Sequence, residues 1–292
     1  MRRTSRLTGL VLTGLLASTT VAASPGVSTA VAAGPEPQWA PAATAPIKPG
    51  VQIRSPSGGQ CTTNFIFIEV GRDADGNETL EDVLIGMAGH CGSTAGNTQT
   101  NGCLAGTVPL GSEFTISGAL KKGTMTYNAW AEMKVPTVET DQNRCRGNDF
   151  AMVSVHPDDW SRINPSLPFW GGPTGLAENV AVGSDLYTYG NSGLRFGISQ
   201  LSPKVEVKAG SSNGGWNHVV YAMSPGIPGD SGSGHVDNEG RAFGVTSTLI
   251  LAPFPAGNGI TDLKRSLDYA RAKTGKDYRL VNGTEAFATP IP

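Results

Sequence analysis

Residues 222–234 read AMSPGIPGDSGSG, a glycine- and proline-rich stretch on which the expected fold depends. Glycine and proline at this density break both helices and strands, so the stretch predicts a stiff loop with few side chains. One aspartate, Asp230, and one serine, Ser231, stand inside it. The loop is therefore either a tight turn with no other role or a support that holds Ser231 out for chemistry. The flanking sequence distinguishes the two.

Short apolar runs separated by turn residues make up most of the flanking sequence. With 39 glycines in the chain, this pattern favours β-strands joined by many tight turns. Short strands at this spacing are typical of antiparallel barrels rather than of alternating strands and helices. The expected strands of the first half are 61–70, 82–90, 104–110, 113–119, 124–127, 129–135 and 149–155. Those of the second half are 185–190, 195–202, 204–209, 218–223, 232–236 and 242–250.

The segment 156–175 has several prolines and little alternation, so it is expected to connect two halves, about 51–160 and about 170–285. One helix is expected near the C-terminus, where ITDLKRSLDYARAKTG (260–275) has apolar residues at helical spacing. Thr261 or Asp262 would cap its start and Gly275 would end it.

The N-terminus begins MRRTSRLTGLVLTGLLASTTVAAS, with arginines, a short apolar run and then small residues. This order is typical of a secretory signal peptide, expected over 1–33, with cleavage after Ala23 or Ala33. A membrane anchor is the alternative, but the run is short and contains polar residues. Residues 34–50 are expected to be a flexible leader or pro-segment, followed by the main domain at 51–285. The mature protein should be exported, extracellular and free of membrane.

The four cysteines, Cys61, Cys91, Cys103 and Cys145, most simply form two disulfides in an exported chain, with three pairings open. A zinc site formed by His90, Cys91, Cys103 and Cys145 is the alternative, but the spacings match no compact ligand pattern. The formal net charge is -2, and no dense cluster of lysine and arginine occurs. Nucleic-acid binding is therefore not expected.

Three stretches carry candidate catalytic side chains: MAGHC (87–91) with His90, NDFAMVSV (148–155) with Asp149, and PGDSGSG (228–234). Singly, each has an ordinary interpretation as a strand end or a turn. Together they supply a serine, a base that can activate it and a carboxylate that can orient the base. The backbone N–H groups of Gly229 and Ser231 would form an oxyanion hole, which explains why the loop is stiff.

The order of His90, Asp149 and Ser231, in AGHC, NDFAMV and GDSGSG, resembles the chymotrypsin-like (trypsin-like) serine peptidase family, in its exported bacterial form. The resemblance covers roughly residues 51–285. It implies an all-β fold of two six-stranded antiparallel β-barrels with a C-terminal α-helix. It also implies that His90 is the general base, Asp149 its orienting partner and Ser231 the nucleophile.

The resemblance further implies the disulfide pairs Cys61 with Cys91 and Cys103 with Cys145. Within the substrate pocket it places a short set of residues, namely Pro225, Ser247, Thr248 and Leu249. Because Pro225 stands where trypsin-like pockets carry an aspartate, a smaller or apolar pocket that favours uncharged side chains is expected.

The chain departs from the family where many members begin with Ile/Val-x-Gly-Gly after cleavage, since residues 34–60 hold no such sequence. The new amine of those members pairs with the aspartate before the serine. Asp230 must therefore have another partner, such as Arg195, and no trypsin-type cleavage should be needed.

The expected function is that of a secreted, monomeric serine endopeptidase that cleaves proteins or peptides through an acyl-enzyme, with no cofactor and no metal. The alternatives are a catalytically silent binding protein and an esterase that uses the same triad. The G-x-S-x-G motif of one esterase class fails, because Ser233 stands where its second glycine belongs. A further histidine, His235, is expected to pack or face solvent.

Overall fold

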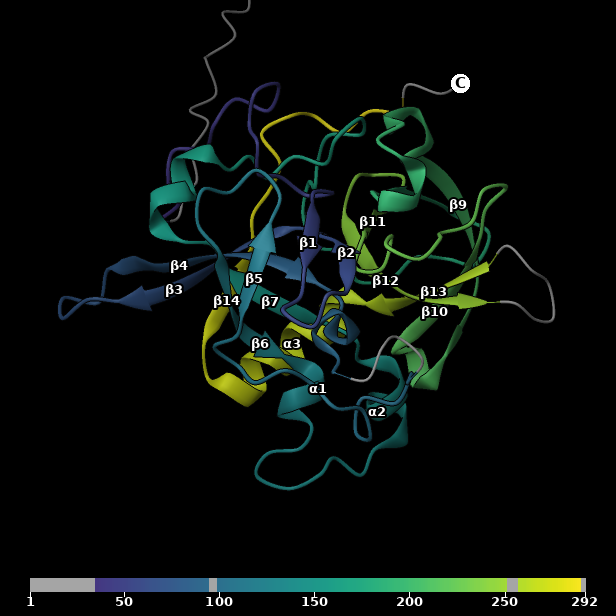
Figure 1. The fold of residues 1–292 in the computed structure, drawn as a ribbon, viewed down its shortest axis with the longest axis horizontal. Helices are drawn as coiled ribbons and strands as arrows, with labels where there is room; N and C mark the ends of the chain where they lie inside the picture. The colour runs from purple at the N-terminus through teal and green to yellow at the C-terminus, as the bar shows by residue number, and fades with distance from the viewer. Residues whose placement is uncertain (1–34, 95–98, 251–256, 290–292) are drawn as a thin grey trace, which may run out of the picture. The chain divides into compact units, whose positions relative to one another are not determined.

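The structure, a computed structural model, describes residues 35–94, 99–250 and 257–289 (Figure 1). The expected signal peptide at 1–33 lies outside these ranges. Within them, no helix is long and apolar enough to cross a membrane. The strands fall into two groups, one for each half of the expected domain.

The first group forms one curled sheet of eight strands in the order β14-β3-β4-β7-β6-β5-β1-β2. Its members are β1 (Gln52–Arg54), β2 (Gln60–Thr62), β3 (Ile66–Arg72), β4 (Glu78–Met87), β5 (Glu113–Ile116), β6 (Gly123–Asn128), β7 (Ala151–Ser154) and β14 (Asp277–Leu280). All neighbouring pairs are antiparallel. The last strand returns from the C-terminal end of the chain and pairs with β3.

The second group closes into a barrel with the strand order β10-β13-β12-β11-β8-β9 (green to yellow in Figure 1). Its strands are β8 (Asp185–Tyr189), β9 (Pro203–Ser212), β10 (Asn217–Tyr221), β11 (Gly234–Val236), β12 (Ala242–Ile250) and β13 (Gly257–Asp262). The expected all-β class and the six-stranded second barrel are confirmed. The first half differs in detail, because β14 extends the β3 edge of its sheet and brings it to eight strands.

The predicted C-terminal helix is present as α3 (Leu263–Thr274). The Asp262 side chain caps it by accepting from Arg265 N, and Gly275 ends it with a φ of 69°. Two shorter helices are α1 (Ala129–Glu132) and α2 (Gln142–Gly147). Single 3-10 turns occur at η1 (Gly89–Gly92), η2 (Pro157–Arg162), η3 (Gly193–Arg195), η4 (Ser199–Leu201) and η5 (Asn213–Gly215).

Three predicted strands are wrong. The segment 129–135 begins with α1, because the Asn128 side chain accepts from Trp130 N and starts a helical turn. The segment 195–202 contains the last residue of η3 and the whole of η4, with Phe196 in the left-handed region at a φ of 52°. The segment 104–110 makes no strand, and only an isolated bridge joins Thr107 to Ser93.

The described part of the expected leader, residues 35–50, packs on the domain. Ile47 is completely buried and forms a parallel bridge with Ile163. The N–H of Ala40 donates to the carbonyl of Ile163 at 2.8 Å. Residues 40–50 are therefore held by backbone hydrogen bonds and apolar burial rather than free, which corrects the expectation of flexibility.

Strand β9 turns its charged side chains into the barrel. Lys204, Glu206 and Lys208 are buried, while Val207 between them is exposed. Each charged side chain has a hydrogen-bond partner. Lys204 donates to Asp230, Lys208 donates to a backbone carbonyl, and the Glu206 carboxylate pairs with a histidine. That histidine is His235, which is fully buried and lies 2.8 Å from the Glu206 carboxylate. Of the two expected placements of His235, packing is the one observed.

Candidate active site

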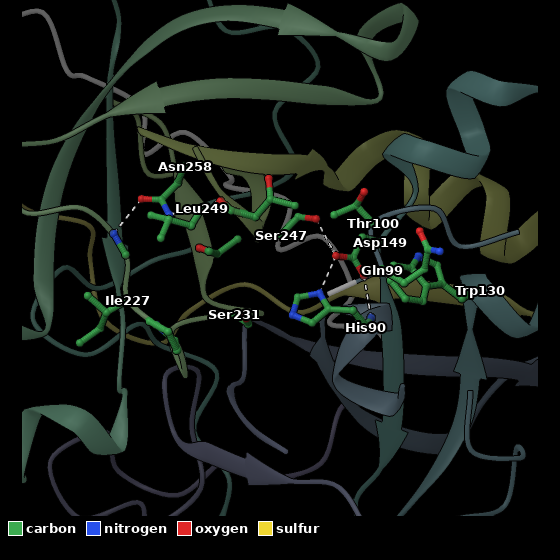
Figure 2. A pocket seen from close by; sticks show the side chains of 14 residues that line it. His90, Gln99, Thr100, Trp130, Asp149, Ile227, Ser231, Ser247, Leu249 and Asn258 are labelled. Atoms are coloured by element: carbon green, nitrogen blue, oxygen red, sulfur yellow. Dashed lines mark hydrogen bonds and ion pairs between the residues drawn. The ribbon is translucent and has the colours of Figure 1, made fainter. Parts of the chain in front are cut away.

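One pocket, with a volume of about 260 Å³, brings together most of the residues that the sequence singled out. The first half of the chain contributes His90, Gln99, Thr100, Trp130 and Asp149 to its lining. The second half contributes Gly226, Ile227, Pro228, Ser231, Thr246, Ser247, Thr248, Leu249 and Asn258. Figure 2 shows the His90 ring with one edge on Asp149 and the other edge turned toward the part of the pocket that holds Ser231.

Strand pairing explains how His90 meets Asp149. His90 lies in the η1 turn that follows β4, and Asp149 lies just before β7. These strands are antiparallel neighbours with Met87 opposite Ala151, so the end of one strand adjoins the start of the other. The His90 Nδ1 and Asp149 Oδ2 atoms are 2.7 Å apart, and the backbone N–H of His90 donates to Asp149 Oδ1 at 2.7 Å.

Ser247, from β12 of the barrel, completes the environment of the carboxylate. Its hydroxyl donates to Asp149 Oδ2 at 2.6 Å (Figure 2). Asp149 is buried and accepts all of these hydrogen bonds, and an ionised carboxylate can only accept. Nδ1 of a neutral His90 must therefore carry the proton, which leaves Nε2 as a proton acceptor.

Burial and charge act in opposite directions on this pair. Burial alone would lower the pKa of His90, but the charge of Asp149 and its hydrogen bond outweigh it and hold that pKa above 6.5. Burial would likewise raise the pKa of Asp149, but the charge of His90 and the hydrogen bonds from His90 and Ser247 hold it below 3.8. The carboxylate thus stays ionised while the imidazole titrates.

The backbone of Ser231 is held between the two halves. Its carbonyl accepts from the N–H of Thr62 at 2.8 Å, and the N–H of the next residue, Gly232, donates to Thr246 O at 2.8 Å. Gly232 has a φ of 92°, and a Cβ there would lie 2.4 Å from the carbonyl oxygen of Thr62. Only glycine fits after the serine at this close approach.

Two backbone N–H groups of the same loop, those of Gly229 and Ser231, have their direction set by the carbonyls that precede them. The carbonyl of Pro228 accepts from the Ser192 hydroxyl at 2.5 Å, and that of Asp230 accepts from Ser233 Oγ at 2.6 Å. Both peptide bonds are trans, so the N–H groups of Gly229 and Ser231 face the opposite way from these anchored carbonyls. Among the described residues neither N–H has a hydrogen-bond partner, and both are therefore free to bind an anionic oxygen.

Asp230 is buried beneath this loop and has two cationic partners. The prediction that Arg195 is a partner is confirmed: its guanidinium forms a two-pronged ion pair with both carboxylate oxygens. Lys204, which the sequence did not suggest, donates to Asp230 Oδ2 at 2.7 Å. Asp230 also accepts from the backbone N–H groups of Ser192 and Ile227, at 3.1 Å each.

Three of the four expected pocket residues, Ser247, Thr248 and Leu249, line the pocket. Pro225 is not among the described lining residues, and its carbonyl accepts from Lys204 Nζ at 3.2 Å. The sequence missed Asn258, whose buried amide Oδ1 accepts from Gly226 N at 2.7 Å (Figure 2). Its motif GNG has no feature that separates it from an ordinary turn.

Two disulfides tie this region together, and their pairing is the one that the resemblance implied. Cys61 on β2 is bonded to Cys91, next to His90, and Cys103 is bonded to Cys145 on α2. In the described part of the chain, the group with metal-ligand spacing is Cys61, His90 and Cys91. The disulfide uses both of its sulfurs, so no thiolate remains there to bind zinc.

Comparisons with known proteins found no matching family model and no matching curated protein. Solved structures similar to this chain include Thermobifida fusca Protease A, with 18% identity over 81% of this chain and 99% of that one, at a TM-score of 0.49. Nocardiopsis Protease shows 17% identity over 80% and 98% of the two chains, at a TM-score of 0.46. A glutamic acid specific serine protease shows 15% identity over 76% and 97%, also at 0.46. At such low identities and TM-scores, these similarities carry no information about the activity of this chain.

Proposed function

We propose that this protein is an exported serine endopeptidase with Ser231 as nucleophile, His90 as general base and Asp149 as the residue that orients the base. One observation carries the proposal. A histidine whose Nδ1 is held by a buried carboxylate shares a pocket with a serine on a loop in which two backbone N–H groups have no hydrogen-bond partner among the described residues. Base, nucleophile and oxyanion donors are the groups that acyl transfer requires.

In this mechanism, Ser231 Oγ attacks the carbonyl carbon of the peptide bond while its proton passes to His90 Nε2. Asp149 stabilises the imidazolium that forms. The N–H groups of Gly229 and Ser231 donate to the oxyanion of the tetrahedral intermediate. His90 then protonates the leaving amine, and a water molecule activated by the same histidine hydrolyses the acyl-enzyme.

The proposal extends to the setting of the reaction. Two disulfides and a signal-like N-terminus fit an extracellular protein that acts as a monomer on protein or peptide substrates. Because Asp230 already has Arg195 and Lys204 as partners, no new N-terminal amine is required to stabilise the loop. No cofactor is needed.

Hydrolysis of casein, measured beside hydrolysis of p-nitrophenyl acetate, tests this function. We expect casein to be cut at internal sites. Turnover of the ester with intact casein would favour an esterase with the same triad. Binding of casein without turnover of either substrate would favour a silent binding protein.

Activity should depend on the protonation of His90. The charge of Asp149 and its hydrogen bond hold the pKa of His90 above 6.5, while the pKa of Asp149 stays below 3.8. The imidazole is therefore the member of this pair that becomes protonated first as the pH falls. The base must be neutral to accept a proton, so kcat/KM should fall about tenfold per pH unit once the pH drops below the pKa of His90. A pH profile of peptide hydrolysis checks this, and undiminished turnover at pH 4 would contradict the role of His90.

Cleavage should favour uncharged side chains before the scissile bond. Asp149 is the one carboxylate among the described lining residues, and His90 and Ser247 already occupy it. Lysine and arginine side chains therefore find no counter-charge. A peptide-library profile should show little cleavage after Lys or Arg, and a profile dominated by those residues would refute the prediction.

Asn258→Asp gives a matched variant for this prediction. An aspartate keeps the oxygen that accepts from Gly226 N. Its second, charged oxygen replaces the amide nitrogen that donates to Thr248 O at 3.3 Å, so this oxygen has no donor there and can pair with a cationic substrate side chain. A charge-assisted hydrogen bond contributes about 1.5–3 kcal/mol, so kcat/KM for Lys and Arg peptides should rise roughly tenfold or more. An unchanged profile would show that Asn258 does not face the substrate side chain.

A further inference from the structure

Lys204 joins both ends of the loop that carries the candidate oxyanion donors. From β9 inside the barrel, its Nζ donates to Asp230 Oδ2 at 2.7 Å and to the carbonyl of Pro225 at 3.2 Å. These two acceptors bracket the segment 225–230, which includes Gly229. Lys204 is buried, with 7% of its surface exposed.

The other contacts of Asp230 hold only one end of this segment or bind it to a different part of the chain. Arg195, which lies in η3 outside the barrel strands, forms an ion pair with the Asp230 carboxylate. Ile227 closes a local turn, since its N–H donates to Asp230 Oδ2 at 3.1 Å and its carbonyl accepts from Asp230 N at 2.9 Å. Among the described side chains, Lys204 is the one that donates to both Pro225 and Asp230.

Gly229 has a φ of 99° and no side chain, so hydrogen bonds to the backbone hold it in place. Its carbonyl accepts from Thr62 Oγ1 at 2.7 Å and from Gln60 Nε2 at 3.1 Å, and the Pro228 carbonyl accepts from the Ser192 hydroxyl. These bonds fix the middle of the segment 225–230, and the direction of its amides also depends on where the two ends lie. An ammonium group with two fixed acceptors sets the separation between Pro225 and Asp230. A shift of about 1 Å at a reacting group can reduce a rate by about 100-fold.

We propose that Lys204 is a positioning residue that holds the oxyanion loop in its active arrangement from inside the barrel. This inference rests on the proposed peptidase function. Lys204 lies on β9, distant in sequence from the catalytic motifs, and it would set the position of the two amides that stabilise the transition state. Its effect should appear in kcat, because an oxyanion exists only in the transition state and the intermediate.

Lys208 offers a matched control on the same strand. It faces the barrel interior like Lys204, is buried to the same degree at 6% exposed, and also donates to a backbone carbonyl, that of Val180 at 2.6 Å. Its Nζ lies 5.1 Å from the centre of the Phe243 ring, and among the described residues it forms no hydrogen bond or ion pair with the segment 225–230. Loss of either lysine removes one buried ammonium, but only one of these changes touches the loop.

The experiment compares Lys204→Met and Lys208→Met with the wild type in kcat, KM and melting temperature on one peptide substrate. Both variants should have a lower melting temperature than the wild type. We expect kcat to fall on the order of 100-fold in Lys204→Met with KM within about threefold, and Lys208→Met to retain kcat within about threefold. Lys204→Arg, which keeps the charge and two donors, should recover most of the lost kcat.

A peptide boronic acid, which mimics the tetrahedral intermediate, should lose affinity for Lys204→Met by a factor similar to the loss in kcat. If Lys204→Met does not fold, Lys204→Gln, which retains an amide donor, is measured in its place with the same expectations. Equal kcat values for the Lys204 and Lys208 variants, with an active wild type, would overturn the role of Lys204 alone. An inactive, folded wild type would overturn the proposed function and this inference together.

Discussion

Replacement of Ser231 by alanine is expected to lower kcat for peptide hydrolysis by a factor on the order of 10⁵ to 10⁶, the loss seen when a serine nucleophile is removed from such a triad. The reason is that no other hydroxyl is available at this position in the pocket. The change should leave the fold intact, because the Ser231 backbone, rather than its hydroxyl, makes the bonds to Thr62 and, through the next residue, to Thr246. Hydrolysis of a chromogenic peptide, with the melting temperature measured alongside, checks both parts.

Ser224→Ala is the control for this variant, since Ser224 is exposed on the same segment and is not among the described residues that line the pocket. It should keep wild-type kcat. If Ser231→Ala retained kcat within tenfold of the wild type, the nucleophile would be a different group.

Asp149→Asn is expected to lower kcat on the order of 10⁴-fold at neutral pH, the size of effect known for this substitution in a Ser-His-Asp triad. An asparagine can keep one acceptor oxygen for the backbone N–H of His90. Its amide nitrogen must then face Nδ1 of the same ring, where the carboxylate accepted before. His90 is therefore forced to the other tautomer, with the proton on Nε2, and it can no longer accept the proton of Ser231.

Ser247→Ala separates this tautomer effect from a general disturbance of the carboxylate. It removes one donor to Asp149 and leaves the pair with His90 in place. We expect a loss of roughly ten- to 100-fold, because one hydrogen bond to a charged group contributes about 1.5–3 kcal/mol. Equal losses in Asp149→Asn and Ser247→Ala would mean that Asp149 does not act through the tautomer of His90.

The parts of the fold that follow local rules could be predicted from the sequence. The helix at 260–275 was readable from its apolar spacing, and both Asp262 and Gly275 act at its ends as expected. The short strands and turns of the second half predicted an antiparallel barrel, and the family resemblance implied six strands, although β13 was not among the predicted strands. The meeting of His90 with Asp149 was predicted from residue chemistry, and the pairing of β4 with β7 is the physical cause.

Other parts depend on contacts that no local pattern reveals. The segment 129–135 is apolar like a strand, but the Asn128 cap and the packing of Trp130 make it helical. In KVEVKA (204–209), alternation predicts a strand but not which face is buried. The charged face lies inside, because Asp230, His235 and the Val180 carbonyl offer partners there. The pairing of these buried charges with partners from other segments depends on the closed barrel, so the sequence of one strand does not reveal it.

The same reason explains why Lys204 and Asn258 were missed as site residues while Arg195 was anticipated. The need of Asp230 for a cation is visible in the sequence, but the second cation comes from a strand whose charges suggest solvent exposure. Asn258 lies on β13, which pairs with both β10 and β12 in the closed barrel, and this pairing brings it to the pocket.

The measurement that tests the central claim most directly is labelling of the folded protein with a fluorophosphonate probe, followed by mass mapping of the modified peptide. The probe reacts with a serine only when a base activates its hydroxyl. The account predicts that the wild type is labelled at Ser231 and that labelling is lost in both Ser231→Ala and His90→Ala. A well-folded wild type that stays unlabelled, or a label that persists in Ser231→Ala at the wild-type rate, would contradict it.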